Sequence, residues 1–255
     1  MQKTFMNSTV YSMPALLATI AKLFPGLRST ISKNHAIQNA DYCEYDGIYF
    51  PFDERFMNRK RFVAIACGAI EAEEVKIASK VIRADDIVVE FGAGLGIAAS
   101  RVNRICAPKK HVCFEANPFL ENYAKQLFQE NELNIQFETS GLGNGDKLEF
   151  FAMKDYILSS FEMPEVGNDF EKILIPTITL DEVLADYKPT AIFCDIEGAE
   201  LSYFKSKIFE GVDKIIIELH PKAYGGEGVM TFQSYMRGHN FELKFKNGDT
   251  YCFMR

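Results

Sequence analysis

Three glycines at alternate positions follow a short β-branched segment that ends in an acid. The segment is 87–91, its acid is Glu90, and the glycines are Gly92, Gly94 and Gly96. Such a segment predicts a buried strand, and the helix-compatible residues after Gly96 predict a helix. Glycines in the turn between them remove side chains, so the backbone can lie against a ligand. The carboxylate of Glu90 would accept hydrogen bonds from a cationic or hydroxylated ligand, but it would repel a pyrophosphate.

The pattern Glu-x-Gly-x-Gly-x-Gly resembles the S-adenosylmethionine loop of Rossmann-like methyltransferases. We therefore predict contacts with this cofactor from the following residues: Glu90, Gly92, Ala93, Gly94 and Gly96. A dinucleotide loop, Gly-x-Gly-x-x-Gly/Ala, is one alternative. That pattern fails from Gly92, where the last position is Ile97, and passes from Gly94, where it is Ala99. A glycine-rich turn that binds no ligand is the other alternative.

A second acid, Glu115, ends the next predicted strand at residues 111–115. In Rossmann-type sheets an acid at this place binds ribose hydroxyls, which nicotinamide and S-adenosylmethionine cofactors both carry. Alternatively, Glu115 lies near the start of a predicted helix at 118–130, where a negative charge favours the helix dipole. Four neighbouring residues are further candidate cofactor contacts: Ala116, Asn117, Gly141 and Leu142.

Acids and one histidine also gather at the ends of two later predicted strands, 191–195 and 214–219. Ligands of parallel α/β sheets bind beyond the carboxyl ends of the strands, so these side chains should share one rim. The candidate catalytic residues are Asp195, Glu197, Glu218 and His220.

Each candidate has a possible role on this rim. Asp195 would orient an acceptor hydroxyl or the methionine amine, and it would also bind cofactor. His220 suits a general base, because the unperturbed pKa of histidine lies near neutrality. The structural alternatives are helix capping by Asp195 or Glu197 and a backbone hydrogen bond from His220. We predict no metal, because no ligand spacing is diagnostic, although carboxylates with a histidine can hold a hard divalent cation.

Five segments in this order resemble the FkbM family of S-adenosylmethionine-dependent methyltransferases. They are Glu90–Gly96, Glu115–Pro118, Thr179–Asp181, Asp195–Glu200 and Ile217–His220. The resemblance extends to Gly68–Glu74, where Ala69–Ile70 replace a tyrosine that family members often carry, and it spans roughly residues 53 to 220. It implies methyl transfer to an oxygen of a carbohydrate, a lipid-linked sugar or a polyketide-like product. Hence we expect a small hydroxylated acceptor, with a non-catalytic cofactor-binding scaffold or an NAD-dependent oxidoreductase as alternatives.

Alternating predicted strands and helices in a chain of 255 residues indicate an α/β fold with right-handed crossovers. We predict a Rossmann-like class I methyltransferase with a seven-stranded, mostly parallel sheet. A C-terminal antiparallel hairpin (241–245 and 250–254) completes the sheet. Residues 1–80 form a helical extension with a small hairpin, and residues 81–255 form the cofactor-binding domain.

We also predict the local structure of several segments. Residues 1–60 should be irregular, with one amphipathic helix ending at Pro25–Gly26 and a hairpin around Asp46–Gly47. Residues 56–82 should be helical with a break near Cys67–Gly68. The remaining expectations are turn-rich loops at 141–146 and 222–228, a strand at 172–180, a helix at 199–206 and an irregular loop at 153–170 beside the acceptor.

The composition of the chain indicates which classes of partner are expected. The net charge is −7, with a pI of about 5.3 and no block of Lys and Arg, so a nucleic-acid acceptor is not expected. Six cysteines include no Cys-x-x-Cys pair, which suits a reducing cytoplasm. The apolar segment 14–24 is too short to span a membrane. We expect it to pack on the protein or on a partner subunit, which makes a homodimer through the extension possible.

Overall fold

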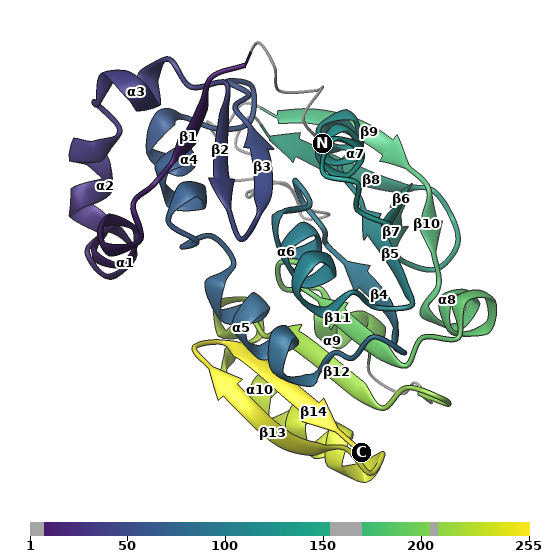
Figure 1. Ribbon diagram of the computed structural model, residues 1–255. Coiled ribbons are helices and arrows are strands. Elements are labelled where there is room, and N and C mark those ends of the chain that lie inside the picture. Colours follow the sequence, from purple (N-terminus) through teal and green to yellow (C-terminus); the bar gives the residue numbers. More distant parts are fainter. Residues whose placement is uncertain (1–7, 154–169, 205–208) are drawn as a thin grey trace.

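A mostly parallel sheet forms the centre of the computed structural model, which describes residues 8–153, 170–204 and 209–255 (Figure 1). Within these ranges the sheet has seven strands in the order β13-β14-β12-β11-β4-β5-β6. The strands are β4 (Ile87–Phe91), β5 (Lys110–Glu115), β6 (Gln136–Thr139), β11 (Ala191–Cys194), β12 (Lys214–Glu218), β13 (Glu242–Asn247) and β14 (Thr250–Met254). Only β14 pairs antiparallel, with β12 on one side and β13 on the other. The predicted fold class and terminal hairpin are therefore confirmed.

The order of the parallel strands creates a switch point between β4 and β11. From β4 the chain builds outward through β5 and β6, and then returns to add β11 and β12 on the other side. The chain segments that follow β4 and β11 therefore run in opposite directions from this point. The space between them forms a crevice beyond the carboxyl ends of the two strands. Asp195, directly after β11, donates its backbone N–H to the Phe91 carbonyl at 3.0 Å, which ties the two strand ends together.

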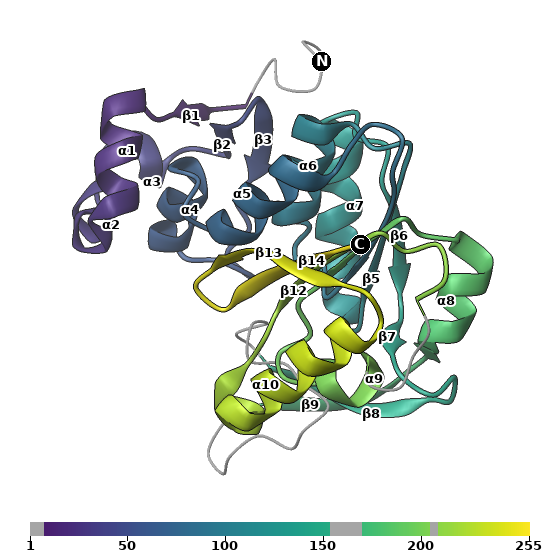
Figure 2. The same ribbon diagram turned by 90° about the horizontal axis from the view of Figure 1, so that it is seen from below.

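Helices cover both faces of the sheet (Figure 2). One face carries α5 (Ala72–Val81), α6 (Ile97–Cys106) and α7 (Glu121–Glu130), and the other carries α8 (Leu180–Tyr187), α9 (Glu200–Phe204) and α10 (Pro221–Gly238). Alternate strand residues supply the two cores: Val88 and Phe193 pack with α5, whereas Val89 and Ile192 pack on the opposite face. Burial on both faces explains why these strands are apolar throughout in the sequence.

The N-terminal extension contains more regular structure than we predicted. Its helices are α1 (Ala15–Leu23), α2 (Pro25–Ile31), α3 (His35–Gln38) and α4 (Arg59–Ala66), and its strands are β1 (Val10–Ser12), β2 (Tyr42–Tyr45) and β3 (Ile48–Pro51). The expectation of one helix was wrong, because Pro25 begins α2 instead of ending the helical region. Proline at the first helical position loses no hydrogen bond. The hairpin at Asp46–Gly47 is confirmed, as is the break near Cys67–Gly68.

The extension packs directly on the sheet domain. Asn131, at the end of α7, accepts a hydrogen bond from the Tyr49 backbone N–H at 2.8 Å and donates one to the Tyr49 carbonyl at 2.9 Å. The Tyr123 hydroxyl donates to the Pro51 carbonyl at 2.8 Å. One apolar cluster joins Phe50 and Phe62 of the extension to Leu127 of α7. The extension thus shares a core with the domain that it covers.

The predicted strand at 172–180 is divided by Pro176. Proline has no N–H for a ladder, so β9 (Phe170–Ile175) pairs with β8 (Leu148–Met153), whereas β10 (Thr177–Ile178) turns away to pair with β7 (Gly141–Leu142). The loop expected at 141–146 therefore begins with two strand residues.

The glycine-rich segment 222–228 is also not the loop that we predicted. It lies within α10, which Pro221 begins and which is interrupted only at Gly225, with φ 70° and ψ 172°. Proline at the first helical position and packing of the later turns through Val229 and Phe232 outweigh the low helix propensity of glycine. Residues 154–169 and 205–208, which include most of the expected acceptor loop and the end of the helix predicted at 199–206, lie outside the described residues. In the part of the chain that the structure describes, no helix is both long and apolar enough to cross a membrane.

At the opposite end of the sheet, Asp86 joins three strands. Its carboxylate accepts two hydrogen bonds from Lys214 Nζ at 2.6 Å, and one each from Thr190 Oγ1 and the Arg83 backbone N–H at 2.7 Å. Burial acts to raise the pKa of Asp86, but these hydrogen bonds outweigh it and lower the pKa. Asp86 is therefore an ionised, nearly buried anchor for β4, β11 and β12.

We predict that Asp86→Ala lowers the free energy of unfolding by about 3 kcal/mol, because it leaves the Lys214 ammonium desolvated without a partner. Urea denaturation at pH 7 measures this effect. Glu121→Ala is the matched control, since it breaks the exposed pair with Lys125 and should cost about 0.5 kcal/mol or less. Equal losses in the two variants would show that the Asp86 network is no stronger than a surface pair.

Candidate active site

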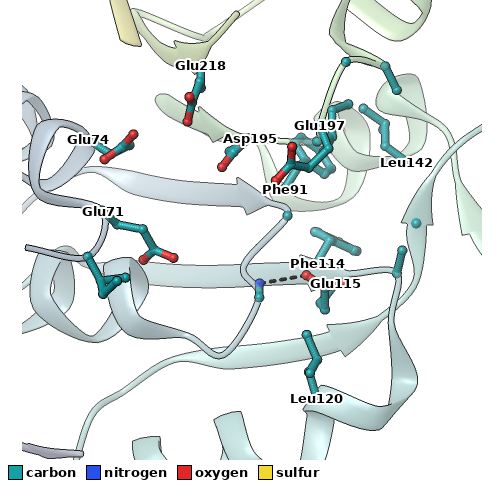
Figure 3. A pocket seen from close by; sticks show the side chains of 18 of the residues that line it. Glu71, Glu74, Phe91, Phe114, Glu115, Leu120, Leu142, Asp195, Glu197 and Glu218 are labelled. Atoms are coloured by element: carbon teal, nitrogen blue, oxygen red, sulfur yellow. Dashed lines mark hydrogen bonds between the residues drawn. The ribbon is translucent and has the colours of Figure 1, made fainter. Parts of the chain in front are cut away.

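A cavity of about 880 Å³ opens at the switch point, beyond the carboxyl ends of β4 and β11 (Figure 3). It is lined by these predicted site residues: Gly92, Gly94, Glu115, Ala116, Gly141, Leu142, Asp195, Glu197 and Glu218. The other predicted site residues are not among those that line the cavity: Glu90, Ala93, Gly96, Asn117 and His220. The volume lies within the range of small-molecule and cofactor sites.

Two of the three loop glycines are required by close packing. Gly92 has φ 80°, and a Cβ there would lie 1.6 Å from the Asp195 carbonyl oxygen. Gly96 has φ 76°, and its Cβ would lie 2.6 Å from the Phe128 ring, so it permits the approach of α6 to α7. Gly94 also has a positive φ, 55°, and it lines the cavity. Gly92 and Gly94 therefore present bare backbone to a ligand, whereas Gly96 serves helix packing.

Glu115 links the glycine loop to the next strand. Its Oε2 accepts a hydrogen bond from the Gly94 N–H at 2.7 Å (Figure 3). Its Oε1 accepts one from the Asn117 N–H at 2.8 Å. Burial raises the pKa of Glu115, and the backbone donors oppose that rise. Asn117 in turn caps η1 (Pro118–Leu120) through the Phe119 N–H. Glu115 is thus held at the cavity wall, and each carboxylate oxygen keeps lone-pair capacity for a ribose hydroxyl.

Glu90 faces away from the cavity. Its carboxylate lies 2.9 Å from His111 Nε2, and it is 3 % exposed. Glu90 thus contacts His111 on the neighbouring strand β5, and its direct contact with the cofactor stays a prediction.

Glu71 lies beside the glycine loop, and we did not predict it as a site residue from the sequence. It has a left-handed φ of 50°, and its Oε2 accepts a hydrogen bond from the Ala98 N–H at 2.6 Å. Gly96 precedes α6 and offers no capping side chain, so Glu71 supplies the cap from another segment. Burial, with repulsion from Glu90 and Glu74, raises the pKa of Glu71 to about 8. The Glu-x-x-Glu pattern at 71–74 was the available sequence signal.

Glu200 organises the turn after β11. Its Oε1 accepts hydrogen bonds from the N–H groups of Ile196 at 3.3 Å and Gly198 at 3.0 Å, and it lies 2.9 Å from His220 Nδ1. The residue is fully buried. Glu200, the first residue of α9, therefore positions the segment that carries Asp195 and Glu197.

His220 is surrounded by carboxylates from three positions. Its Nδ1 contacts Glu200, and its Nε2 lies 3.4 Å from Glu197 Oε2 and 3.6 Å from Asp195 Oδ1. Burial acts to lower the pKa of His220, but Glu197, Glu200 and Asp195 together raise it to about 11. The general-base role that we predicted for His220 does not fit this environment, because an imidazolium has no lone pair to accept a proton.

Two carboxyl groups beside His220, those of Asp195 and Glu218, have raised pKa values. Burial and the nearby Glu218 and Glu197 charges raise the pKa of Asp195 well above its usual value. Burial and the Glu74 charge raise the pKa of Glu218 to about 7. Among the described residues, Asp195 Oδ1 is buried without a hydrogen-bond partner, although the carboxyl group as a whole faces the cavity.

Two clusters bring together potential metal ligands: Glu90 with His111 and Cys113, and Asp195 with Glu218 and His220. Within each cluster the ligand atoms lie within 4.8 Å of one another. In the second cluster both ring nitrogens of His220 face carboxylates, so a cation there would be held by carboxylate oxygens alone unless the imidazolium lost a proton.

The cavity wall is rich in negative charge. Its carboxylates, apart from Glu115, are Glu71, Glu73, Glu74, Asp195, Glu197 and Glu218, and most of them surround one space in Figure 3. A sulfonium and an ammonium would be stabilised by this wall, whereas a pyrophosphate would be repelled. The bare backbone at Gly92 and Gly94, the fixed carboxylate of Glu115 and this acidic wall fit the three parts of S-adenosylmethionine.

Fold and site together define an S-adenosylmethionine-dependent methyltransferase. The family model described as "Methyltransferase FkbM domain" matches residues 86–243. The chain therefore belongs to the FkbM methyltransferase family. S-adenosylmethionine is its cofactor. No curated protein matches the sequence.

Solved structures with similar folds are distant in sequence. A methyltransferase from Pyrococcus furiosus is 15 % identical, with 91 % of this chain and 98 % of that chain covered and a TM-score of 0.48. Methyltransferase FkbM from Methylobacillus flagellatus KT is 15 % identical, with 79 % and 56 % covered and a TM-score of 0.47. M. jannaschii TYW2 in complex with AdoMet is 16 % identical, with 83 % and 82 % covered and a TM-score of 0.45.

We predict that Glu115→Gln weakens S-adenosylhomocysteine binding and that Glu115→Ala weakens it further. Hydrogen bonds to a charged group are worth roughly 1.5–3 kcal/mol each, and the alanine variant also releases the Gly94 N–H. Calorimetry on folded variants measures the affinities. Glu138→Gln, on the next strand and outside the cavity lining, is the control and should bind as the wild type does. Unchanged affinity in Glu115→Ala would contradict the ribose assignment.

We predict that His220 is protonated well above neutral pH. Because its folded-state pKa of about 11 exceeds the unfolded value of about 6.5, its contribution to stability is complete below pH 6.5 and is lost as the pH rises towards 11. The unfolding free energies of wild type and His220→Gln should therefore differ most at pH 6 and converge in alkali. His239→Gln, which loses an imidazole that contacts the Tyr235 carbonyl, is the control. An imidazole nitrogen shift that titrates near pH 6.5 in the wild type would disprove the assignment.

Proposed function

We propose that the protein transfers a methyl group from S-adenosylmethionine to a hydroxyl oxygen of a sugar or another small hydroxylated metabolite. The observation that carries this proposal is Glu218, a cavity-lining carboxyl group whose pKa is raised to about 7 by burial and the Glu74 charge. A hydroxyl is a poor nucleophile until a base accepts its proton, and a base is most effective when its pKa lies near the working pH.

The neighbouring groups support this division of roles. Glu218 would accept the hydroxyl proton, and Asp195 would hold the same hydroxyl or the methionine amine in line for displacement. The positively charged His220 would keep Glu197 and the Asp195 turn in place, since it is paired with Glu200 beneath them. The bound cofactor supplies an electrophilic methyl group on a sulfonium.

Two alternatives from the sequence are less well supported. An NAD-dependent oxidoreductase would have to place a pyrophosphate beside a wall of carboxylates. A non-catalytic cofactor-binding scaffold would have no use for Glu218, whose pKa of about 7 comes at the cost of desolvating a carboxyl group.

The carboxylates of the cavity wall also indicate which kind of acceptor the site can bind. Around Asp195, Glu197 and Glu218 a nucleic-acid backbone would be repelled, which supports a small acceptor at the methyl-transfer position. A homodimer through the extension stays a prediction, and α1 offers a surface for one: Leu16, Leu23 and the adjoining Phe24 are 75 %, 69 % and 62 % exposed. An apolar surface of this kind is typical of interaction sites.

The proposal predicts that Glu218→Gln lowers kcat by about 10²–10⁴-fold, the usual contribution of a general base. S-adenosylhomocysteine affinity should change little. Turnover would be followed with the best acceptor from a panel of sugars, hydroxylated metabolites and amines. The wild-type rate should rise with pH through about 7, and the variant should lose this dependence, because glutamine cannot accept the proton. Glu73→Gln, an exposed carboxylate of the same cavity, is the matched control.

Two results would contradict the proposal. Methylation of nitrogen or carbon, identified by mass spectrometry of the product, would exclude a hydroxyl acceptor. Turnover of Glu218→Gln within about twofold of the wild type would leave proximity alone as the source of acceleration.

A further inference from the structure

Three cations line the same cavity, and all come from the N-terminal extension. They are Lys22 of α1, Arg28 of α2 and Arg61 of α4, whereas every other charged lining residue is an acid. All three precede residues 86–243, which match the FkbM domain. Helices α1, α2 and α4 therefore add positive charge to a cavity whose other charged residues are acids.

Arg28 is held in a fixed orientation without a counter-ion. Its Nε donates to the Ala21 carbonyl at 2.8 Å and its Nη2 donates to the Lys22 carbonyl at 2.9 Å, at the end of α1. Among the described residues no carboxylate pairs with Arg28, and Nη1 has no hydrogen-bond partner. A guanidinium fixed by two backbone acceptors is preorganised, so it loses little freedom when it binds an anion.

Lys22 lies in the same positive region. Within the described ranges it also has no carboxylate partner, and burial together with repulsion from Arg101 lowers its pKa. Residues 8–40 contain no Asp or Glu, although the whole chain has a net charge of −7. The charges of Lys22 and Arg28 both act to lower the pKa of the Cys67 thiol, so the two cations lie in one region, where a bound anion would offset their charge.

We infer that Lys22 and Arg28 form a subsite for a phosphoryl group of the methyl acceptor, with Arg61 on the same wall. This inference rests on the proposed function, because it assigns the rest of the acceptor to Glu218 and Asp195. A dianion matches two cations, and guanidinium and ammonium groups are the usual protein partners of phosphate. The phosphoryl group would belong to a nucleotide-linked or a lipid-linked acceptor.

The test measures anion binding to protein saturated with S-adenosylhomocysteine. One arm uses calorimetry with uridine diphosphate and inorganic pyrophosphate, and the other uses co-sedimentation with phosphatidylglycerol vesicles. We expect Lys22→Gln and Arg28→Gln each to weaken binding about tenfold, the effect of one lost charge-assisted contact. Lys33→Gln is the matched control: Lys33 lies in the same acid-free segment but does not line the cavity.

The results of the two arms distinguish between the possible sources of the phosphoryl group. Binding of the soluble diphosphates, lost in the two variants only, supports a nucleotide-linked acceptor, and the same pattern with vesicles alone supports a lipid-linked one. Equal weakening in Lys33→Gln, or no anion binding in either arm, overturns the subsite. Loss of S-adenosylhomocysteine affinity in Lys22→Gln or Arg28→Gln also overturns it, since the cations would then hold the cofactor carboxylate. Anion binding requires no turnover, so this test can succeed or fail independently of the hydroxyl-transfer proposal.

Discussion

The contact between the ends of β4 and β11 is the constraint on which the site depends. The Asp195 carbonyl occupies the place where any side chain at Gly92 would stand, 1.6 Å from the ideal Cβ position, and the Asp195 N–H is bonded to Phe91. This approach puts the carboxyl group of Asp195 at the switch point, next to Glu218 on the neighbouring strand. It also exposes the backbone of the glycine loop to the cavity. A residue other than glycine at this position would separate the two strands and the two halves of the site.

An excess of buried negative charge follows from that geometry. Parallel strands end at the same edge, so the acids at or just after the ends of β5, β11 and β12 converge there. The protein compensates for only part of this charge: His220 is held as an imidazolium by Glu200 and Glu197, and Glu71 is bonded to the start of α6. The pKa values of Asp195 and Glu218 stay raised. A cationic cofactor supplies the missing positive charge, so charge balance couples its binding to the ionisation of these carboxyl groups.

The N-terminal extension lines the cavity as well as packing on the sheet domain. It shares a core with α7, and its last part supplies Glu71, which caps the helix after the glycine loop. Its helices α1, α2 and α4 contribute the three basic residues of the cavity, Lys22, Arg28 and Arg61. The residues that we predict to bind the cofactor lie within the matched FkbM domain, whereas Lys22, Arg28 and Arg61 lie outside it. This separation suits a family whose members share one methyl donor and differ in their acceptors.

The sequence alone determined the features that arise from local pattern: the strand-turn-helix of the glycine loop, the alternating strands and helices, the terminal hairpin and the acids that end the strands. Sheet topology then brings strand ends together by a general rule, which is why Glu115, Asp195 and Glu218 could be assigned to one rim in advance. Only the tertiary structure decided that His220 is an imidazolium and that Glu90 turns away to His111. It alone brought Lys22 and Arg28 to the cavity and made a helix of the glycine-rich segment at 222–228. Each of these depends on groups distant in the chain, because pKa values and ion pairs follow interatomic distance and burial, which no local sequence pattern specifies.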